Sequence, residues 1–301
     1  MPSYPTLDPK LDVVFKMLFG RPQNRELLVS LLEAVLDLPT AIRSVQVESD
    51  LGKEAVDDKG IALDVRVELE DGQQVDVEMQ SQPRLSRRER GLYYWARMYG
   101  GQLRRGEGYD ELCRCVVIQI LDFRELETAR FHSIFRVIEI HDHEEFSDQL
   151  ELHLLELPKL GAESLQNGEP ALARWGKFLR ASSDEEREAL AMTDPILRKA
   201  KDALEDLSAD PEARVLAEMR DMALKSYQLE MGTARRVGRA EGRVEGRAEA
   251  LALVLLRLLD AKFGTVPEPI AVRVRSAVEA ELLRWSEKVL SAESIDAVFG
   301  D

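Results

Sequence analysis

Two carboxylates and an amide stand at spacings that could serve metal-dependent chemistry. Asp64 belongs to one alternating run of sequence, and Glu78 and Gln80 belong to the next. Hard divalent cations such as Mg²⁺ prefer carboxylate oxygens as ligands. Asp64 and Glu78 could therefore hold a metal ion if the chain brings the two runs side by side. The alternative is a pair of ordinary carboxylates on a solvated outer face.

The sequence around these residues predicts a β-hairpin. Apolar side chains recur at every second position in residues 61–69 and again in 75–79, as in strands that are buried on one face. A three-residue loop that ends at Gly72 keeps the apolar faces together and needs a left-handed residue at that glycine. The same register sets Asp64 directly opposite Glu78, where like charges destabilise a sheet.

The elements around the hairpin predict a mixed α/β layer. In chain order they are helices at 8–19 (capped by Asp8) and 24–36 (capped by Asn24), a strand at 42–47, the hairpin, a helix at 85–103 and a strand at 112–121. The last of these strands is apolar almost throughout, so we expect it to be buried on both faces. Two more strands are expected at 131–140 and 150–157. The His- and acid-rich segment between them, 141–145, matches no compact zinc spacing and reads as a solvated loop.

The helix at 85–103 carries a concentration of positive charge. The whole chain has a formal net charge of −15, which argues against nucleic-acid binding by its entire surface, yet seven arginines stand against one acid between residues 84 and 105. Arg87, Arg90 and Arg97 are candidates for contacts with DNA phosphates. The alternative is a helix surface that balances an acidic sheet. The residues expected to face the core are Leu92, Trp95 and Tyr99.

The second half of the chain is predicted to be helical. Pro or Asp residues mark the starts of four helices, at about 170–181, 184–192, 194–207 and 211–230, and a small helical bundle is expected over 250–299. We therefore divide the chain into an α/β domain (1–160), a helical region (161–232), a repeat helix (233–250) and a C-terminal helical domain (251–301).

Residues 238–249 repeat a Gly-Arg-(Ala/Val)-Glu unit three times. On a single helix these units place like charges at i,i+4, which is unfavourable, and the three glycines weaken the helix further. The pattern becomes favourable if the arginine column of one helix meets the glutamate column of another. We therefore predict a homo-oligomer through this segment. A semi-flexible linker helix is the alternative.

The sequence lacks the motifs of several classes of enzyme. No phosphate-binding loop, no Gly-x-Ser-x-Gly elbow and no His-Glu-x-x-His frame occurs. The sequence contains no run of about eighteen apolar residues, so we expect no membrane helix. Its first residues lack the pattern of a signal peptide. Cys113 and Cys115 are too close in sequence to favour a disulfide, so we expect a cytoplasmic protein.

The spacing Asp64-x13-Glu78-x-Gln80 resembles the core motif of PD-(D/E)XK nucleases. The segments 7–16, 59–64, 77–80 and 93–99, with Gly106 and Tyr109, are similar to the Rpn family of recombination-promoting nucleases, over about residues 5–160. The segments 256–264 and 283–285 resemble a helical domain that often follows such nucleases.

This resemblance implies a restriction-endonuclease-like sheet flanked by helices and an Mg²⁺-dependent DNA endonuclease of recombination, transposition or defence against foreign DNA. Asp64 and Glu78 would bind the metal together with the backbone carbonyl of Met79. Gln80 stands where the superfamily has a catalytic lysine, and it can orient a water or a phosphate oxygen but carries no charge. The alternative function is a catalytically weak or inactive nuclease fold that serves as an oligomeric DNA-binding scaffold.

Two residues of the N-terminal matching segment are further candidates. Lys16 could reach a DNA phosphate, and Asp12 could be an accessory acid of the site. Helix capping or salt bridging is the alternative for both residues.

Overall fold

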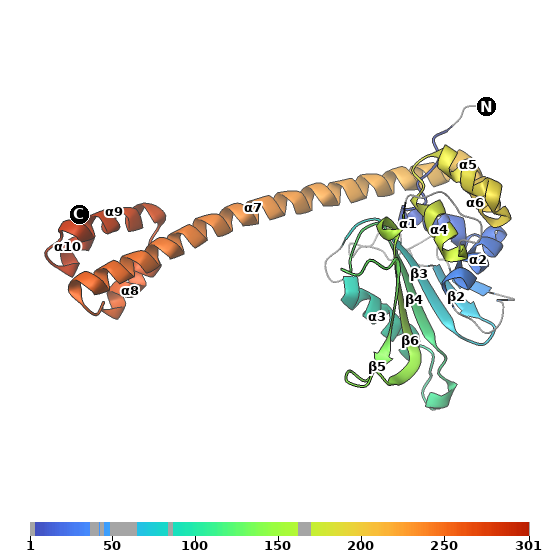
Figure 1. Cartoon of the computed structure of the whole chain (residues 1–301), viewed down its shortest axis with the longest axis horizontal. Helices are drawn as coiled ribbons and strands as arrows, with labels where there is room; N and C mark the ends of the chain where they lie inside the picture. Colours follow the sequence, from blue (N-terminus) through green and yellow to red (C-terminus); the bar gives the residue numbers. More distant parts are fainter. Residues whose placement is uncertain are drawn as a thin grey trace. The chain divides into compact units, whose positions relative to one another are not determined.

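The computed structural model describes residues 4–36, 42, 45–48, 65–83, 87–161 and 170–300. The chain separates into two compact units, Met1–Met222 and Ala223–Asp301. The first unit contains the sheet, and the second is helical (Figure 1).

A mixed six-stranded sheet forms the centre of the first unit, as the sequence predicts. Its strands in spatial order are β1 (Val45–Glu48), β2 (Val65–Leu69), β3 (Gln74–Gln80), β4 (Cys115–Leu121), β6 (Glu145–Glu156) and β5 (His132–Ile138). The pairs β3–β4 and β4–β6 are parallel, and the remaining pairs are antiparallel. All seven residues of β4 are buried, which confirms the prediction of a strand covered on both faces.

The register of the central hairpin is the predicted one. Val67 lies opposite Val75, and Val65 lies opposite Val77. The backbone N–H of Leu69 donates to the carbonyl of Gln73 at 2.9 Å, which closes the three-residue loop. Gly72 has a φ of +83°, and a Cβ there would lie 2.8 Å from the sulfur of Cys113. Both the backbone angle and the close approach therefore require glycine.

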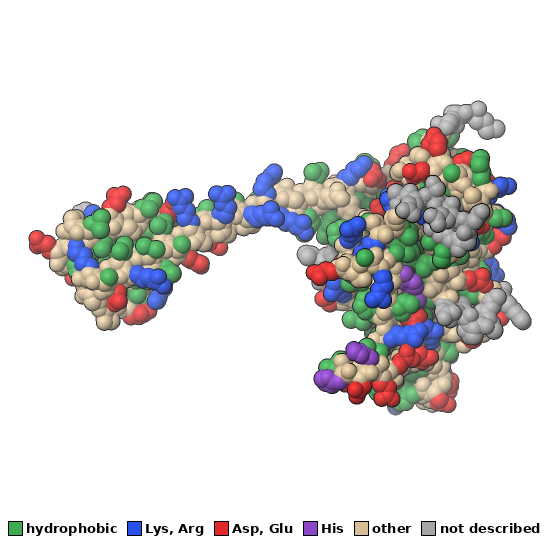
Figure 2. All heavy atoms as spheres, in the orientation of Figure 1, with side chains coloured by type: hydrophobic (Ala, Val, Ile, Leu, Met, Phe, Trp, Pro, Cys, Tyr) green, Lys and Arg blue, Asp and Glu red, His purple; other side chains and the backbone are tan. Residues whose placement is uncertain are grey.

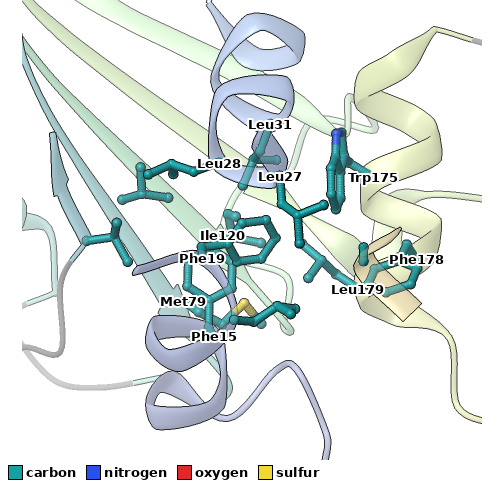
Figure 3. Packing of buried hydrophobic residues seen from close by; sticks show 14 of the residues in the cluster. Phe15, Phe19, Leu27, Leu28, Leu31, Met79, Ile120, Trp175, Phe178 and Leu179 are labelled. Atoms are coloured by element: carbon teal, nitrogen blue, oxygen red, sulfur yellow. The ribbon is translucent and has the colours of Figure 1, made fainter. Parts of the chain in front are cut away.

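Helices cover the apolar face of the sheet. They are α1 (Asp12–Gly20), α2 (Arg25–Val35), α4 (Ala171–Arg180), α5 (Asp184–Thr193) and α6 (Pro195–Ala209). Phe19 of α1 packs against Phe15 and against Trp175 of α4, with ring centroids 4.5 and 5.5 Å apart (Figure 3). Met79 and Ile120 reach the same core from the sheet. Residues after 170 thus belong to the core of the first unit.

The two predicted N-caps do not form. α1 begins at Asp12, and Asp8 instead makes a preceding turn in which its carbonyl accepts from the N–H of Leu11 at 3.1 Å. Asn24 stands at the N-cap position of α2, but its side chain makes no capping hydrogen bond and its NH₂ group donates to the carbonyl of Leu18 at 2.8 Å. Short 3-10 turns at Pro22–Asn24, Tyr109–Glu111 and Leu157–Lys159 complete the connections.

The helix α3 (Arg87–Gly100) covers the other face of the sheet. Trp95 and Tyr99 stack with ring centroids 5.0 Å apart and pack against the sheet, as predicted. Leu92 does not, because it is 47% exposed. The buried residues of α3 are Arg87, Gly91 and Met98. The helix is rotated in this way because the sheet offers Arg87 a polar partner, described below.

The second unit forms around the end of a long helix, α7 (Pro211–Phe263), which starts in the first unit. Its other helices are α8 (Glu268–Arg275), α9 (Glu279–Ser291) and α10 (Ile295–Phe299). Leu255 and Leu259 of α7 share a core with Trp285 and Phe299, which confirms the predicted helical bundle. The segments expected at 211–230 and 233–250 form one continuous helix. Among the described helices, none combines the length and apolar character needed to span a bilayer.

Candidate active site

Strand β3 turns three polar side chains toward α3. Successive strand residues point to opposite faces, so Val75, Val77 and Met79 enter the apolar core while the even-numbered residues face α3. The exposed fractions of these even-numbered residues are 0% for Asp76, 3% for Glu78 and 7% for Gln80. The face that could have been solvated is therefore closed over by a helix.

One carboxylate oxygen of Glu78 contacts two side-chain amides and one guanidinium group. Its Oε2 accepts hydrogen bonds from Nε2 of Gln80 at 2.6 Å and from Nε2 of Gln119 at 3.0 Å. A guanidinium nitrogen of Arg90 lies 3.6 Å from the same oxygen. Gln119 comes from β4, where the parallel register sets it beside Glu78. These contacts hold the Glu78 carboxylate in one orientation.

Four buried oxygens beside these contacts have no hydrogen-bond partner among the described residues. They are Oε1 of Glu78, Oε1 of Gln80 and both carboxyl oxygens of Asp76. Buried acceptors without donors are rare in folded proteins because desolvation is not compensated. A hard divalent cation, which prefers oxygen ligands, would satisfy such a set. The residues therefore fit a metal of this kind, although no group of three or more His, Cys, Asp or Glu that could hold one occurs in the described ranges.

Asp76 is in an environment that disfavours its charge. Burial, and then the neighbouring Glu78, raise the pKa of the Asp76 carboxyl to about 8, and Arg66 and Arg90 oppose the shift only in part. Asp76 therefore binds a proton at neutral pH when no cation is beside it. A bound cation would compete with that proton, because it supplies the missing positive charge.

Arg87 fixes the orientation of Gln119. Its guanidinium donates to Oε1 of Gln119 and forms an ion pair with Glu125 at 3.0 Å. Because arginine can only donate, the Gln119 amide must turn its oxygen to Arg87 and its NH₂ group to Glu78. Arg87 is 4% exposed, so it offers little surface to a DNA phosphate and acts here as a positioning residue.

The other two predicted metal ligands are Asp64 and Met79. Asp64 lies outside the described residues. The side chain of Met79 points into the apolar core, so only its backbone carbonyl could contribute to a site on the other face. The predicted roles of these two residues remain predictions.

The other two predicted phosphate contacts on α3 are Arg90 and Arg97. Arg90 also lies over the ring of Tyr94, with its guanidinium carbon 5.7 Å from the centroid. Arg97 is exposed, with its guanidinium carbon 6.0 Å from the centroid of the Tyr93 ring. Arg97 is thus open to solvent, whereas Arg90 forms an ion pair with Glu78.

The N-terminal candidates lie in α1. Asp12 pairs with the guanidinium of Arg220, whose Nε donates to both carboxylate oxygens at 2.8 and 2.9 Å. Asp12 therefore forms a salt bridge, which was the alternative to its role as an accessory acid. Lys16 is 5% exposed and belongs to the helix that covers the apolar face. It likewise offers little surface to a phosphate.

Sequence reasoning missed two members of this cluster, Asp76 and Gln119. Each had a signal. Asp76 shares the face of Glu78, two residues away, and the predicted hairpin register places it opposite Arg66. Gln119 is the single polar residue in the apolar strand β4, and a buried amide in such a position needs partners.

One comparison with known proteins identifies a family. A family model described as PD-(D/E)XK nuclease family transposase matches residues 9–232 of the 301. The matched range contains Asp64, Glu78 and Gln80 together with the whole sheet, and it supports nuclease activity and DNA binding in general. No curated protein and no solved structure matches the chain. With more than half of its length matched and a mixed sheet flanked by helices, the chain belongs to the PD-(D/E)XK nuclease family transposases.

Proposed function

We propose that the chain is a metal-dependent DNA endonuclease that hydrolyses phosphodiester bonds with Mg²⁺. The observation that carries the proposal is the set of four buried oxygens without donors around Glu78. Asp64, Glu78 and the carbonyl of Met79 are the proposed ligands, and Asp76 adds a second carboxylate on the same strand. When bound, Mg²⁺ would activate a water and offset charge on the phosphate.

The chain's own residues have separate tasks in this proposal. Gln119 and Gln80 hold Glu78 through the hydrogen bonds at 3.0 and 2.6 Å. Arg90, 3.6 Å from Glu78, supplies positive charge where the phosphate would acquire negative charge. Gln80 keeps its Oε1 free to orient a water.

A plasmid assay tests the activity. Full-length protein should nick or linearise a supercoiled plasmid in Mg²⁺, and EDTA should abolish the cleavage. Asp64→Ala should lower the rate by at least about a hundredfold, because a carboxylate ligand is lost. Asp148→Ala removes an exposed acid of β6 and should leave the rate unchanged. Cleavage that persists in EDTA, or that Asp64→Ala leaves intact, would contradict the proposal.

One observation favours the second candidate function, a weakly active or inactive DNA-binding scaffold. Gln80 occupies the place of the catalytic lysine, and its NH₂ group already donates to Glu78. A glutamine supplies no positive charge and neither takes up nor releases a proton at neutral pH. DNA binding by wild type without any metal-dependent cleavage in the plasmid assay would establish this function.

We place the activity in the cytoplasm and in recombination, transposition or defence against foreign DNA. The free thiols of Cys113 and Cys115 support a reducing compartment. The family description supports a role in rearranging or removing DNA.

We also propose that α7 joins two copies of the chain. Gly238, Gly242 and Gly246 lie on α7, and a Cβ added at any of them would meet nothing within 4 Å. The chain itself therefore does not require glycine there. Arg239 and Arg243 are exposed and have no ion pair among the described residues, and Figure 2 shows basic side chains gathered along this helix. A second copy would give the arginines glutamate partners, and the glycines would allow close approach.

Alanine substitution separates this contact from a linker helix. Changing all three glycines to alanine should reduce the mass found by sedimentation, because the added methyl groups hold the helices apart. A plain linker would instead gain about 1 kcal/mol of helix stability per substitution, with its mass unchanged. Gly100→Ala is a matched control, since a Cβ there also meets nothing within 4 Å.

A further inference from the structure

An open cavity of about 300 Å³ lies between α3 and the β4–β6–β5 side of the sheet. Its walls are mainly apolar and come from Leu92 of α3, Phe135 of β5 and Leu150, Leu152 and Leu154 of β6. Leu92 and Phe135 are 47% and 43% exposed, so the cavity is reached from solvent. Leu92, expected in the core, therefore lines this open cavity instead.

The cavity adjoins the Glu78 cluster. Arg87 and Gln119 form part of its wall, and Gln119 is the residue that donates to Glu78 at 3.0 Å. The side chain of Gln119 therefore links the wall of the cavity to the Glu78 carboxylate. All of these residues belong to the first unit of the chain.

Guanidinium groups stand at the edge of the apolar walls. Arg88 and Arg136 line the cavity, with 65% and 42% of their side chains exposed. Arg88 also contacts Glu125 at 2.9 Å, and Arg136 contacts Glu145 at 3.0 Å and the buried Glu151 at 2.5 Å. The site thus combines an apolar interior that includes the Phe135 ring with exposed arginine N–H donors at its margin, which suits a ligand with a flat apolar part and hydrogen-bond acceptors such as phosphate oxygens.

In DNA the flat apolar part is the base. A base inside a duplex is stacked on both sides and cannot enter a side pocket unless it leaves the stack. An unpaired base is free to do so, and aromatic side chains bind such bases through their faces without regard to sequence. The cavity volume lies at the lower end of the range for small-molecule pockets.

We propose that this cavity binds one unpaired nucleobase beside the proposed cleavage site, with Phe135 as its stacking surface. The substrate class is then DNA with unpaired nucleotides, such as bubbles, gaps and single strands. The inference rests on the proposed nuclease function for the position of the phosphate.

The test measures DNA binding by the full chain in EDTA, where no cleavage occurs. Fluorescence anisotropy compares a duplex with the same duplex carrying a bubble of unpaired bases. Wild type should bind the bubble at least about tenfold more tightly. Phe135→Ala should lose about tenfold in affinity for the bubble and nothing for the duplex, since base–aromatic stacking is of this size. Phe135→Tyr, which keeps the ring, should retain the preference.

Phe146→Ala is the matched control. Phe146 is an exposed phenylalanine of β6 that does not line the cavity, so its removal should change neither affinity. A 2-aminopurine placed in the bubble should change its emission on binding to wild type and not on binding to Phe135→Ala. Equal affinity of wild type for both DNAs, or no binding to the bubble, would overturn the inference.

The outcomes separate this inference from the proposed function. A preserved bubble preference with no cleavage of any DNA would overturn the endonuclease and leave the base site in place. Metal-dependent cleavage without a bubble preference would do the reverse. A lower sedimentation mass for Phe135→Ala would show that a second copy of the chain fills the cavity, and would overturn the base site.

Discussion

Glu78→Gln should lose at least about a hundredfold in metal-dependent DNA cleavage while the protein stays folded. In the wild type, Oε2 of Glu78 receives three groups and Oε1 receives none. A glutamine at this position would turn its single oxygen toward Gln80, Gln119 and Arg90. Its NH₂ group would then occupy the place of the free oxygen, where it repels a cation. The substitution therefore keeps the local contacts and removes the metal ligand.

Calorimetric titration with Mg²⁺ and the plasmid assay measure the two effects independently. Glu68→Gln is the control, because Glu68 is an exposed residue of β2 in the same hairpin and should tolerate the same change. Wild-type Mg²⁺ affinity in Glu78→Gln would show that Glu78 is not a ligand. Loss of affinity with cleavage intact would show that the metal bound at Glu78 is not the catalytic one.

Asp76→Asn should stabilise the metal-free protein more and more as the pH rises. The pKa of Asp76 is raised by burial from an ordinary 3.8 to about 8 in the folded chain. Between these values the folded state holds a proton that the unfolded state has released. The free energy of unfolding of the wild type therefore falls as pH rises through this window, by at most about 1.4 kcal/mol per pH unit. Asparagine does not titrate, so the variant lacks this loss.

Urea unfolding in EDTA at several pH values between 4 and 8 measures the difference between variant and wild type. The difference should grow with pH and reach at least about 2 kcal/mol at pH 8. Taking the difference cancels the titration of other groups, including His132, whose pKa is lowered by burial to about 4. Mg²⁺ should then raise the stability of the wild type at pH 8 and of the variant much less. A pH-independent difference, as expected for Asp148→Asn on the surface, would contradict the assignment.

The hairpin could be predicted in detail because its determinants are local. Alternation fixed which side chains share a face, and the requirement that apolar faces meet selected the three-residue loop that ends at Gly72. The cluster around Glu78 could be predicted only in part. Gln119 lies beside Glu78 because β3 and β4 pair in parallel, although the two strands are far apart in sequence. Short-range sequence patterns do not predict the register of such a pair.

The faces of α3 illustrate the same limit. Spacing assigned Leu92 to the core and left Arg87 outside, because apolar residues normally face inward. The observed helix buries Arg87, whose guanidinium donates to Gln119 and forms an ion pair with Glu125. A buried arginine of this kind becomes predictable only when its partners are known.

The length of α7 had a signal that could have been used. No proline occurs after Pro211 until Pro267, and Gly264 adopts a φ of +81° directly after the last helical residue. A proline at the start and a glycine just past the end are the ordinary limits of one helix. The low helix propensity of the three glycines in the repeat is not enough to interrupt α7.

The parallel pairing of β3 with β4 also has a consequence for the order of folding. A parallel pair cannot close through a tight turn, and here 34 residues separate Gln80 from Cys115 once the loop and α3 are counted. Local contacts such as the β2–β3 hairpin form quickly, whereas such long-range pairings form slowly. Glu78 therefore meets Gln119, and Gln119 meets Arg87, only after α3 and β4 have left the ribosome and docked. During synthesis the carboxylates of the hairpin therefore emerge before the residues that complete the candidate site. We expect DNA cleavage only after the whole sheet has folded.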